Sequence, residues 1–145
     1  MPLTVKERTK LENAARMGFA AYLEWAEMTR IEIVEQEMAL VSEKYRYGGT
    51  PDAIGYCNGK LSLLDWKTGR VYSDHLLQLA AYRNLIRETR PEDKLESFHM
   101  LRFNRDTGAF SHFMFPPEIV DLGWEQFKLL RQAYELDKKI KKAVK

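Results

Sequence analysis

The sequence predicts a mixed α/β fold with the element order helix, three strands, helix, two strands, helix. Three observations support this prediction. Apolar residues recur at helical spacing near both ends of the chain, runs of β-branched and aliphatic residues lie between them, and an Asn-Gly pair marks a hairpin. The chain has 145 residues and 45% hydrophobic content, which is enough to bury one core. We therefore expect one domain over residues 1–145, with a central sheet flanked by helices.

The first helix is expected from about Lys6 to Thr29, because apolar residues recur there at alternating spacings of four and three. These residues are Leu11, Ala15, Gly18, Tyr22 and Trp25. The next stretch, Ile31–Ser42, is rich in β-branched and aliphatic residues and predicts one strand. The chain therefore opens with a helix that leads directly into the sheet.

Two strands joined by a tight turn come next, Tyr45–Tyr56 and Lys60–Trp66. The turn is Asn58-Gly59, a strong hairpin signal because both central residues of a type I′ turn need positive φ. In the second arm, apolar residues fall on both faces, which is typical of a central strand. We therefore expect a covered cleft near the end of this arm.

The register of this hairpin brings acidic residues together. If Asn58-Gly59 form the loop, Asp52 lies directly opposite Asp65; a four-residue loop keeps this pairing and a three-residue loop does not. Directly opposed Cβ atoms lie roughly 4.5–5.5 Å apart, and strand alternation adds Lys67 to the same face. Two like charges about 5 Å apart repel by roughly 3 kcal/mol at an effective dielectric of about 20, and a divalent cation would reverse the sign. The pattern predicts a metal site, and the alternative is a surface salt bridge between Asp65 and Lys67.

The second half of the chain continues with a helix that Ser73 can cap and that runs to about Arg90. Two strands follow, Phe98–Phe103 and Phe110–Phe115, with the turn residues Arg105–Gly108 between them. A last helix begins after two prolines. Its positions 119, 122, 126, 129, 133, 136 and 140 are apolar apart from Gln126, and we expect this stripe to dock on the sheet.

The composition indicates the cellular compartment of the protein and the class of partner it binds. The lone Cys57 cannot form an internal disulfide, which fits a reducing compartment. No apolar stretch approaches the ~20 residues of a membrane span, and the first residues lack the apolar segment of a signal peptide. We therefore expect a cytoplasmic location without a membrane partner. A net charge of +2 is too small to indicate nucleic-acid binding, so such a partner must be inferred from local residues.

The order of motifs resembles the PD-(D/E)XK nuclease superfamily. More narrowly, it is similar to the RecB-like exonuclease group that includes the nuclease domains of Cas-four-type and mitochondrial genome-maintenance exonucleases. The motifs are Glu37, Gly49-Thr50-Pro51-Asp52, Leu64-Asp65-Trp66-Lys67-Thr68-Gly69 and Gln78-Leu79-Ala80-Ala81-Tyr82. A bare D-x(n)-D-x-K pattern often arises by chance, whereas this conjunction is more specific. The resemblance implies a restriction-endonuclease-like core with a central mixed sheet of about five strands.

The resemblance also implies a chemistry, that of a Mg²⁺- or Mn²⁺-dependent deoxyribonuclease. Asp52 and Asp65 would hold one or two metal ions, with the backbone carbonyl of Trp66 as a further ligand. Lys67 would position or deprotonate the attacking water. Glu37 matches the family's acidic residue ahead of the Gly-Thr-x-Asp motif, and Glu35 on the same predicted strand face is the alternative.

The resemblance also assigns residues to substrate binding. Gln78 and Tyr82 are four apart and so share one helix face, which in this family touches the substrate backbone; the alternative is a polar fringe. Thr68 and Arg70 follow the lysine and would meet a phosphate beside the cleft. The family's metal-binding histidine in the first helix is missing, since Tyr22 occupies that place.

The expected partner is DNA, single-stranded or a duplex with an end. Scattered basic and aromatic residues would grip it: Lys44, Arg46, Arg83, Arg87, Tyr45, Tyr47 and Tyr72. Because the chain is small for this family, enclosing a strand would need a second subunit or a partner protein. Three functions are therefore considered: an exonuclease acting on DNA ends, a structure-specific endonuclease or junction resolvase, and a non-catalytic nucleic-acid-binding module.

Overall fold

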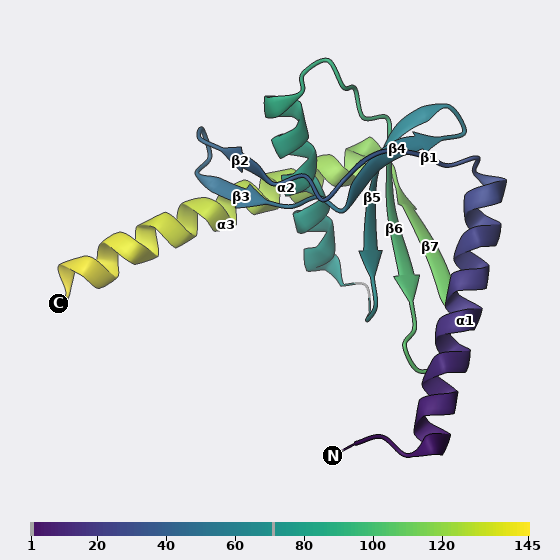
Figure 1. The fold of residues 1–145 in the computed structure, drawn as a ribbon. Helices are drawn as coiled ribbons and strands as arrows, with labels where there is room; N and C mark the ends of the chain where they lie inside the picture. Colours follow the sequence, from purple (N-terminus) through teal and green to yellow (C-terminus); the bar gives the residue numbers. More distant parts are fainter. Residues whose placement is uncertain (1, 71) are drawn as a thin grey trace.

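A five-stranded mixed sheet forms the centre of the computed structural model, which describes residues 2–70 and 72–145 (Figure 1). Its strands, in sheet order, are β1 (Glu32–Gln36), β4 (Ala53–Cys57), β5 (Lys60–Lys67), β6 (Ser97–Phe103) and β7 (Phe110–Phe115). The β5–β6 pair is parallel, and the other three pairs are antiparallel. The predicted fold class, a mixed sheet of about five strands flanked by helices, is confirmed, and it is consistent with a restriction-endonuclease-like core.

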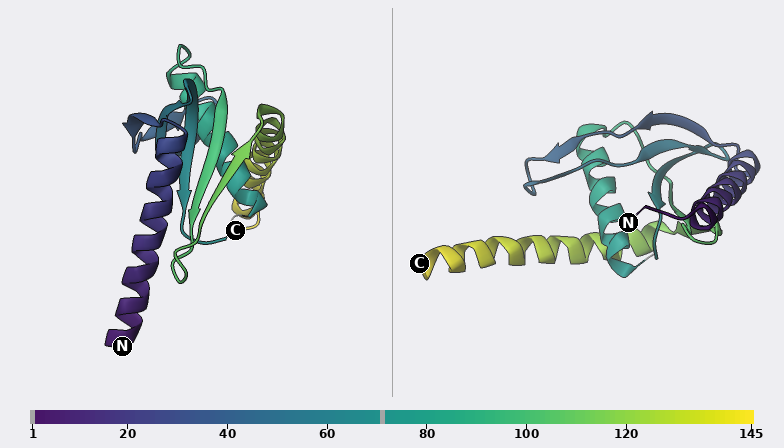
Figure 2. Two further views of the ribbon diagram at one scale, coloured as in Figure 1. Left: turned by 90° about the vertical axis from the view of Figure 1, so that its right-hand side faces the viewer. Right: turned by 60° about the horizontal axis from the view of Figure 1, so that its bottom comes forward.

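Three helices cover the sheet: α1 (Val5–Met28), α2 (Ser73–Thr89) and α3 (Pro117–Ala143). Figure 2 shows α1 on one face of the sheet and α2 with α3 on the other. Neighbouring residues of β5 face opposite sides, so Leu63 packs with α2 residues and Leu64 packs with Trp25 of α1. Both leucines are fully buried, which confirms that β5 is a central strand.

The first half of the chain has more strands than expected. Ile31–Ser42 divides into β1 and β2 (Leu40–Ser42), and the next predicted strand divides into β3 (Tyr47–Gly49) and β4. Strands β2 and β3 form a separate antiparallel ribbon beside α2 (Figure 1). The physical reason is local, because Glu37 with φ +50° ends β1 and Pro51 lacks the N–H that would continue β4.

Helix starts follow their capping residues. In α1, the Thr4 side chain accepts from the Glu7 N–H and the Glu7 carboxylate accepts from the Thr4 N–H, so two otherwise unpaired donors are satisfied. In α2, the N-cap is Tyr72 rather than the expected Ser73. His75 Nδ1 accepts from the Tyr72 N–H at 3.0 Å, so this histidine has a structural role at the helix start.

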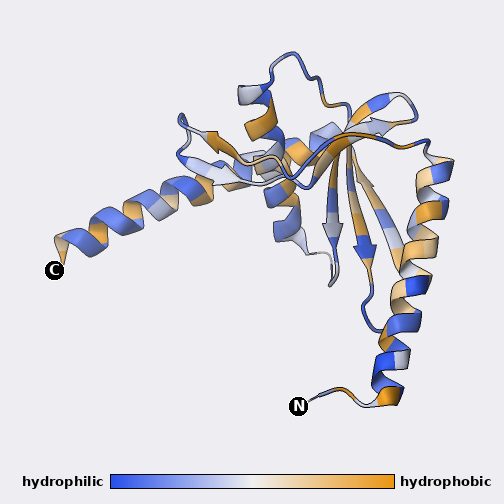
Figure 3. Ribbon diagram, in the orientation of Figure 1, coloured by the Kyte–Doolittle hydropathy of each residue, from blue (hydrophilic) through white to orange (hydrophobic). Residues whose placement is uncertain are grey.

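The expectation for the last helix is wrong in one respect. The face of α3 that packs on α2 carries Val120 and Gly123, which are buried, and the partly buried Trp124. A Cβ atom on Gly123 would lie 3.0 Å from the Leu76 carbonyl oxygen, so the helices approach closely at this glycine. The predicted apolar stripe lies on another face of α3 and is exposed. In Figure 3, hydrophilic and hydrophobic residues alternate along the projecting part of this helix.

None of the helices in the described residues combines the length and the apolar content that a membrane span requires.

Candidate active site

The hairpin register places the two central carboxylates as expected. Cys57 pairs with Lys60, and the pairing runs without a shift to Ala53 opposite Leu64, so the next pair outward is Asp52 opposite Asp65. The loop residues Asn58 and Gly59 have φ of +51° and +79°. Both values are positive, as a two-residue type I′ turn requires.

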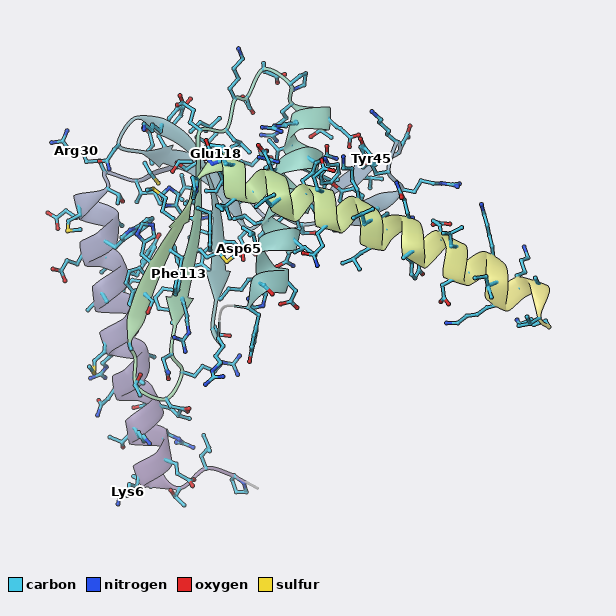
Figure 4. All side chains as sticks on the ribbon, turned by 180° about the vertical axis from the view of Figure 1, so that it is seen from behind. Lys6, Arg30, Tyr45, Asp65, Phe113 and Glu118 are labelled. Carbon is cyan, nitrogen blue, oxygen red and sulfur yellow. The ribbon has the colours of Figure 1, made fainter. Side chains whose placement is uncertain are left out.

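The Asp65 carboxylate is buried beside a lysine. The residue is only 3% exposed, and Lys67 Nζ lies 2.9 Å from Asp65 Oδ2. Apart from this ion pair, that oxygen has no hydrogen-bond donor among the described residues. The Trp66 N–H donates to Asp52 Oδ2 at 2.8 Å, which fixes the second carboxylate next to the first. Figure 4 places Asp65 between the sheet and α2.

Burial and the neighbouring charge of Lys67 shift the pKa of Asp65 in opposite directions. The pKa of this carboxyl is raised to about 6 overall: burial raises it most, Lys67 lowers it, and Asp52 raises it. Burial is the largest cause because a desolvated carboxylate is disfavoured relative to the neutral acid. The lysine therefore compensates only part of the cost of an ionised Asp65, and an added cation at this face would stabilise the ionised form.

A chain of side-chain contacts links the carboxylates to α2. Lys67 Nζ donates to Gln78 Oε1 at 2.5 Å, and Gln78 Nε2 donates to the Tyr82 hydroxyl at 3.0 Å. Tyr82 in turn packs on Gly49, where an added Cβ would lie 2.7 Å from the ring. The structure therefore brings the glycine, lysine, glutamine and tyrosine motifs to one face.

The predicted acidic ligand on β1 lies farther out. Glu37 is exposed and lines a pocket of about 330 Å³ with Gln36, Asp52 and Trp66. Its N–H donates to the Asp52 carbonyl at 2.9 Å. Among the described residues, no group of three or more His, Cys, Asp or Glu side chains is arranged to hold a metal. Glu37 is therefore near the two aspartates but is not assembled with them.

The choice between the two glutamates is clearer in the structure. Glu35 forms an ion pair with Arg90 at the end of α2. The positive φ at Glu37 ends β1 before that residue, so the two side chains do not follow one strand alternation. Glu35 is thus engaged elsewhere, and Glu37 alone of the two lines the pocket beside Asp52.

The residues present suit a hard divalent cation. Two carboxylates face one another, and one buried carboxylate oxygen has only the lysine as its partner. In the continued register, Pro51 lies opposite Trp66 and has no N–H to donate to the Trp66 carbonyl. Mg²⁺ needs only one or two carboxylates, because it keeps several water ligands. The donor set therefore fits Mg²⁺ or Mn²⁺, with Glu37 at its edge.

Two other predicted site residues lie at the exposed end of β5. Thr68 and Arg70 are both exposed, and Arg102 Nε donates to the Gly69 carbonyl between them at 2.6 Å. Tyr22 lies on the α1 side of the sheet, where its ring packs edge-on against Trp66 at 6.4 Å. Tyr22, at the position where the sequence resemblance implies a histidine, thus has a packing role.

A groove runs along α2 and shares Gln78 and Tyr82 with the contact chain that leads to Lys67. Its volume is about 540 Å³, and it is lined by Gln78 and Tyr82 from α2, Arg46 beside β3, and Arg131 and Tyr134 from α3. The sequence did not indicate the α3 contribution, since a different stripe was expected to face the sheet. The spacing of Phe127, Arg131 and Tyr134 at four and three would have been the signal.

Several residues expected to grip DNA are structural. Arg83 is 2% exposed and forms an ion pair with Asp121 of α3 at 2.8 Å. The Tyr47 hydroxyl donates to the Ala81 carbonyl at 2.7 Å and accepts from Asn84. Burial raises the pKa of Tyr47 to about 12, and Tyr45 packs edge-on against Trp124. These side chains hold α2, α3 and the β2–β3 ribbon together.

Comparisons with known proteins support the fold. No protein-family model matches the sequence, and no curated protein matches it. A crystal structure from Eubacterium rectale, named "Putative exonuclease", is similar with a TM-score of 0.58 and 11% identity over 81% of this chain and 50% of that chain. The protein SSO0001 has 20% identity over 79% of this chain and 57% of that one, but its TM-score of 0.40 supports no argument. The chain thus spans about half the length of these two proteins, and the first likeness shows a shared fold.

Proposed function

We propose that this protein is a metal-dependent nuclease of the PD-(D/E)XK type that hydrolyses DNA phosphodiester bonds. The observation that carries the proposal is the juxtaposition of Asp52, Asp65 and Lys67 on one face of one hairpin, with the lysine 2.9 Å from a buried carboxylate oxygen. A protein that needed only stability would have no reason to bury the Asp65 carboxylate opposite a second, half-buried acid, Asp52. The fold shared with a protein named as an exonuclease is consistent with this reading.

The metal would be held by the carboxylates of Asp52 and Asp65 and by the Trp66 carbonyl, with Glu37 reaching in from the pocket edge. A bound Mg²⁺ or Mn²⁺ supplies neutralisation of the scissile phosphate and a water of lowered pKa. The Trp66 N–H contributes by fixing one oxygen of Asp52, which leaves the other oxygen of that carboxylate for the cation.

Lys67 is the residue that would act on water and phosphate. Its ammonium has three N–H donors, of which Asp65 takes one and Gln78 takes another. The third donor is available for the attacking water or a phosphate oxygen. Gln78 therefore orients the ammonium, and Tyr82 orients Gln78, so these α2 residues position the lysine as well as lining the groove.

The groove favours a single strand or a frayed duplex end as substrate. Arg46 supplies positive charge along it, and Arg131 holds the Arg46 carbonyl and pairs with Glu135. Tyr134 supplies an aromatic ring on which a base can stack. Thr68 and Arg70 would contact a phosphate at the other side of Lys67. Phosphate contacts of this kind give affinity without sequence preference. We therefore propose an exonuclease that acts on DNA ends.

A structure-specific endonuclease or junction resolvase is the second candidate. The observation behind it is the exposed apolar stripe of α3, because a second copy bound there would add a second cleavage site. An exonuclease can form the same dimer, so the dimer alone does not decide between the two functions. The substrate then distinguishes the candidates, since an exonuclease needs a free end and an endonuclease does not.

The deciding experiment is incubation of the protein with end-labelled linear DNA and with covalently closed circular DNA, each with Mg²⁺, Mn²⁺ or EDTA. Loss of the linear DNA alone, dependent on metal, is the expected result. The matched controls are Asp65→Asn and Lys67→Ala, which should both be inactive. Rapid cutting of the closed circle would support the endonuclease, and no cutting of either DNA under any condition would overturn the nuclease proposal.

A further inference from the structure

The outer face of α3 carries a heptad pattern. Apolar positions recur there at strictly alternating spacings of three and four, interrupted by one glutamine, and all of these residues are exposed. They are Ile119, Leu122, Gln126, Leu129, Ala133, Leu136 and Ile140, called the α3 seam here. Leu122 and Leu129 are each 64% exposed, Leu136 is 58% and Ile140 is 62%. A 3.5-residue repeat of this kind, with leucine at one heptad position three times, is typical of a coiled-coil seam.

The α3 seam lies opposite the face that packs on the protein. At 100° per residue, Leu122 is roughly 200° around the helix from the buried Val120, and Leu129 is roughly 200° from Phe127. The C-terminal half of α3 also extends beyond the sheet and α2 (Figures 1 and 4, and the right-hand view of Figure 2). An isolated helical segment of this length is only marginally stable in water. A packing partner on the α3 seam would explain both features.

The charges of α3 indicate what this partner is. Its first half carries three acidic residues, Glu118, Asp121 and Glu125, against one lysine, Lys128. Its second half carries Arg131 and lysines at positions 138, 139, 141 and 142 against two acidic residues, Glu135 and Asp137. A parallel pair of such helices would bring eight lysines together. An antiparallel pair would set each acidic half beside the basic half of the other helix, and it would also oppose the two helix macrodipoles favourably.

We propose that the α3 seam binds the α3 seam of a second copy of this chain in an antiparallel pair. With Leu129 opposite the partner's Ala133, the same register sets Leu122 opposite the partner's Ile140. The flanking Glu125 then lies beside the partner's Lys139, and this pair occurs twice. The two-fold axis passes near residue 131. This inference rests on the exposed face of α3 alone and does not depend on nuclease activity.

The first test is the mass of the protein in solution, measured by sedimentation over a range of concentrations. The expected mass is twice 17.0 kDa. The double substitution Leu129→Glu with Leu136→Glu should give a monomer with an unchanged circular dichroism spectrum, because both side chains are exposed. Leu23→Glu on α1, where the side chain is 50% exposed, is the matched control and should leave the dimer intact. A wild-type monomer at all concentrations, or a dimer that survives the double substitution, overturns the proposal.

The second test is helix direction, measured by disulfide cross-linking under mild oxidation. In the proposed register residue 132 lies next to its own copy, whereas residue 136 is separated from its copy by roughly 15 Å along the axis. Gln132→Cys should therefore cross-link and Leu136→Cys should not. Cys57 is buried and common to both variants, so it does not distinguish them. Cross-linking at 136 without cross-linking at 132 would show a parallel pair and overturn the antiparallel arrangement.

Discussion

The surroundings of Asp65 make the stability of the folded protein dependent on pH. Its pKa is raised from 3.8 to about 6, so the folded protein favours the protonated carboxyl. The stabilising contribution is therefore complete below about pH 4 and is lost as the pH rises through about 6. A shift of this size corresponds to roughly 2–3 kcal/mol, since one pKa unit is about 1.4 kcal/mol.

This dependence gives a first prediction, for the protein without divalent metal. Asp65→Asn should unfold at a higher temperature than the wild type above pH 7, because the neutral amide carries no desolvated charge. The difference should shrink towards pH 4. Thermal melts from pH 4 to pH 8 in EDTA measure it, and equal pH slopes for the two proteins would contradict the assignment of the raised pKa to this residue.

Metal addition gives a second prediction. A cation that binds only the folded state adds RT ln(1 + [L]/Kd), about 2.7 kcal/mol at a hundredfold excess over Kd. Mn²⁺ should therefore raise the melting midpoint relative to EDTA. Asp52→Asn should raise the metal-free midpoint and abolish the metal shift, because it removes both the repulsion and a ligand. Identical melts with and without metal would count against the site.

Substitutions of the four charged residues at and near the site should differ in their effects on cleavage and on metal binding. Lys67→Ala is expected to remove cleavage while keeping the metal-induced shift, because the ammonium is not a ligand, and Asp65→Ala should lose both. Glu37→Ala should impair cleavage more than Glu35→Ala, since Glu35 pairs with Arg90 away from the pocket. Cleavage assays paired with melts in Mn²⁺ measure these differences, and equal mild effects in all four variants would locate the activity elsewhere.

Gly49 gives a prediction about the contact chain that supports the lysine. Gly49→Ala would place a Cβ 2.7 Å from Tyr82, and the ring must move to avoid it. Overpacking of this kind costs roughly 1–3 kcal/mol, and the displaced hydroxyl would lose its bond from Gln78. We expect lower stability and a lower kcat. Gly69→Ala is the matched control, because an added Cβ there meets nothing within 4 Å.

At the scale of elements, one ion pair ties α2 to α3. Arg83 is buried and Asp121 is its partner, so removing the carboxylate leaves a charge without a counter-ion in the interior. Asp121→Ala should destabilise the protein by roughly 1–3 kcal/mol in urea melts. Asp137→Ala breaks the exposed pair with Lys141 and should cost under about 1 kcal/mol. An equal loss of unfolding free energy in the two variants would mean that Asp121 does not stabilise the buried charge of Arg83.

Some elements follow from short stretches of sequence and some do not. The β4–β5 register was predictable because Asn58-Gly59 determines a two-residue loop, and every pair outward follows from it. The division of Ile31–Ser42 into two strands was not, because it depends on a positive φ at Glu37, a conformation that is uncommon for this residue type. The turn residues thus predicted the β4–β5 hairpin, whereas the break after β1 depends on a backbone conformation that the residue type does not indicate.

At the scale of the whole molecule, we predict a strong effect of salt on cleavage. Substrate binding by Arg46 and Arg70 would release counter-ions, so activity on linear single-stranded DNA should fall steeply between 50 and 200 mM salt, roughly the range over which phosphate contacts weaken. Sequence changes in the substrate should have little effect. Arg46→Gln should flatten the salt dependence, whereas Lys141→Gln on the far end of α3 should not. A salt-independent rate would contradict the proposed phosphate contacts.

The sequence by itself determined the fold class, the β4–β5 register and the juxtaposition of Asp52, Asp65 and Lys67. These features depend on residues close together in the chain, where a turn type and strand alternation are sufficient. The tertiary structure alone decided which side chains are buried between elements. The sequence predicts Arg83 and Tyr47 to be surface residues that contact DNA. In the structure, both lie where α2 packs against other elements.

The tertiary structure also decided which face of α3 packs inward. The strongest apolar stripe of the helix is its outer face. The inner face includes Gly123, where an added Cβ would lie 3.0 Å from the Leu76 carbonyl oxygen, so a larger side chain would force a shift of a few tenths of an ångström. Periodicity along one helix shows which of its faces is most apolar. It gives no information about the shape of the surface against which the helix packs. Shape complementarity with α2 selected the inner face, and this choice left the stronger stripe exposed.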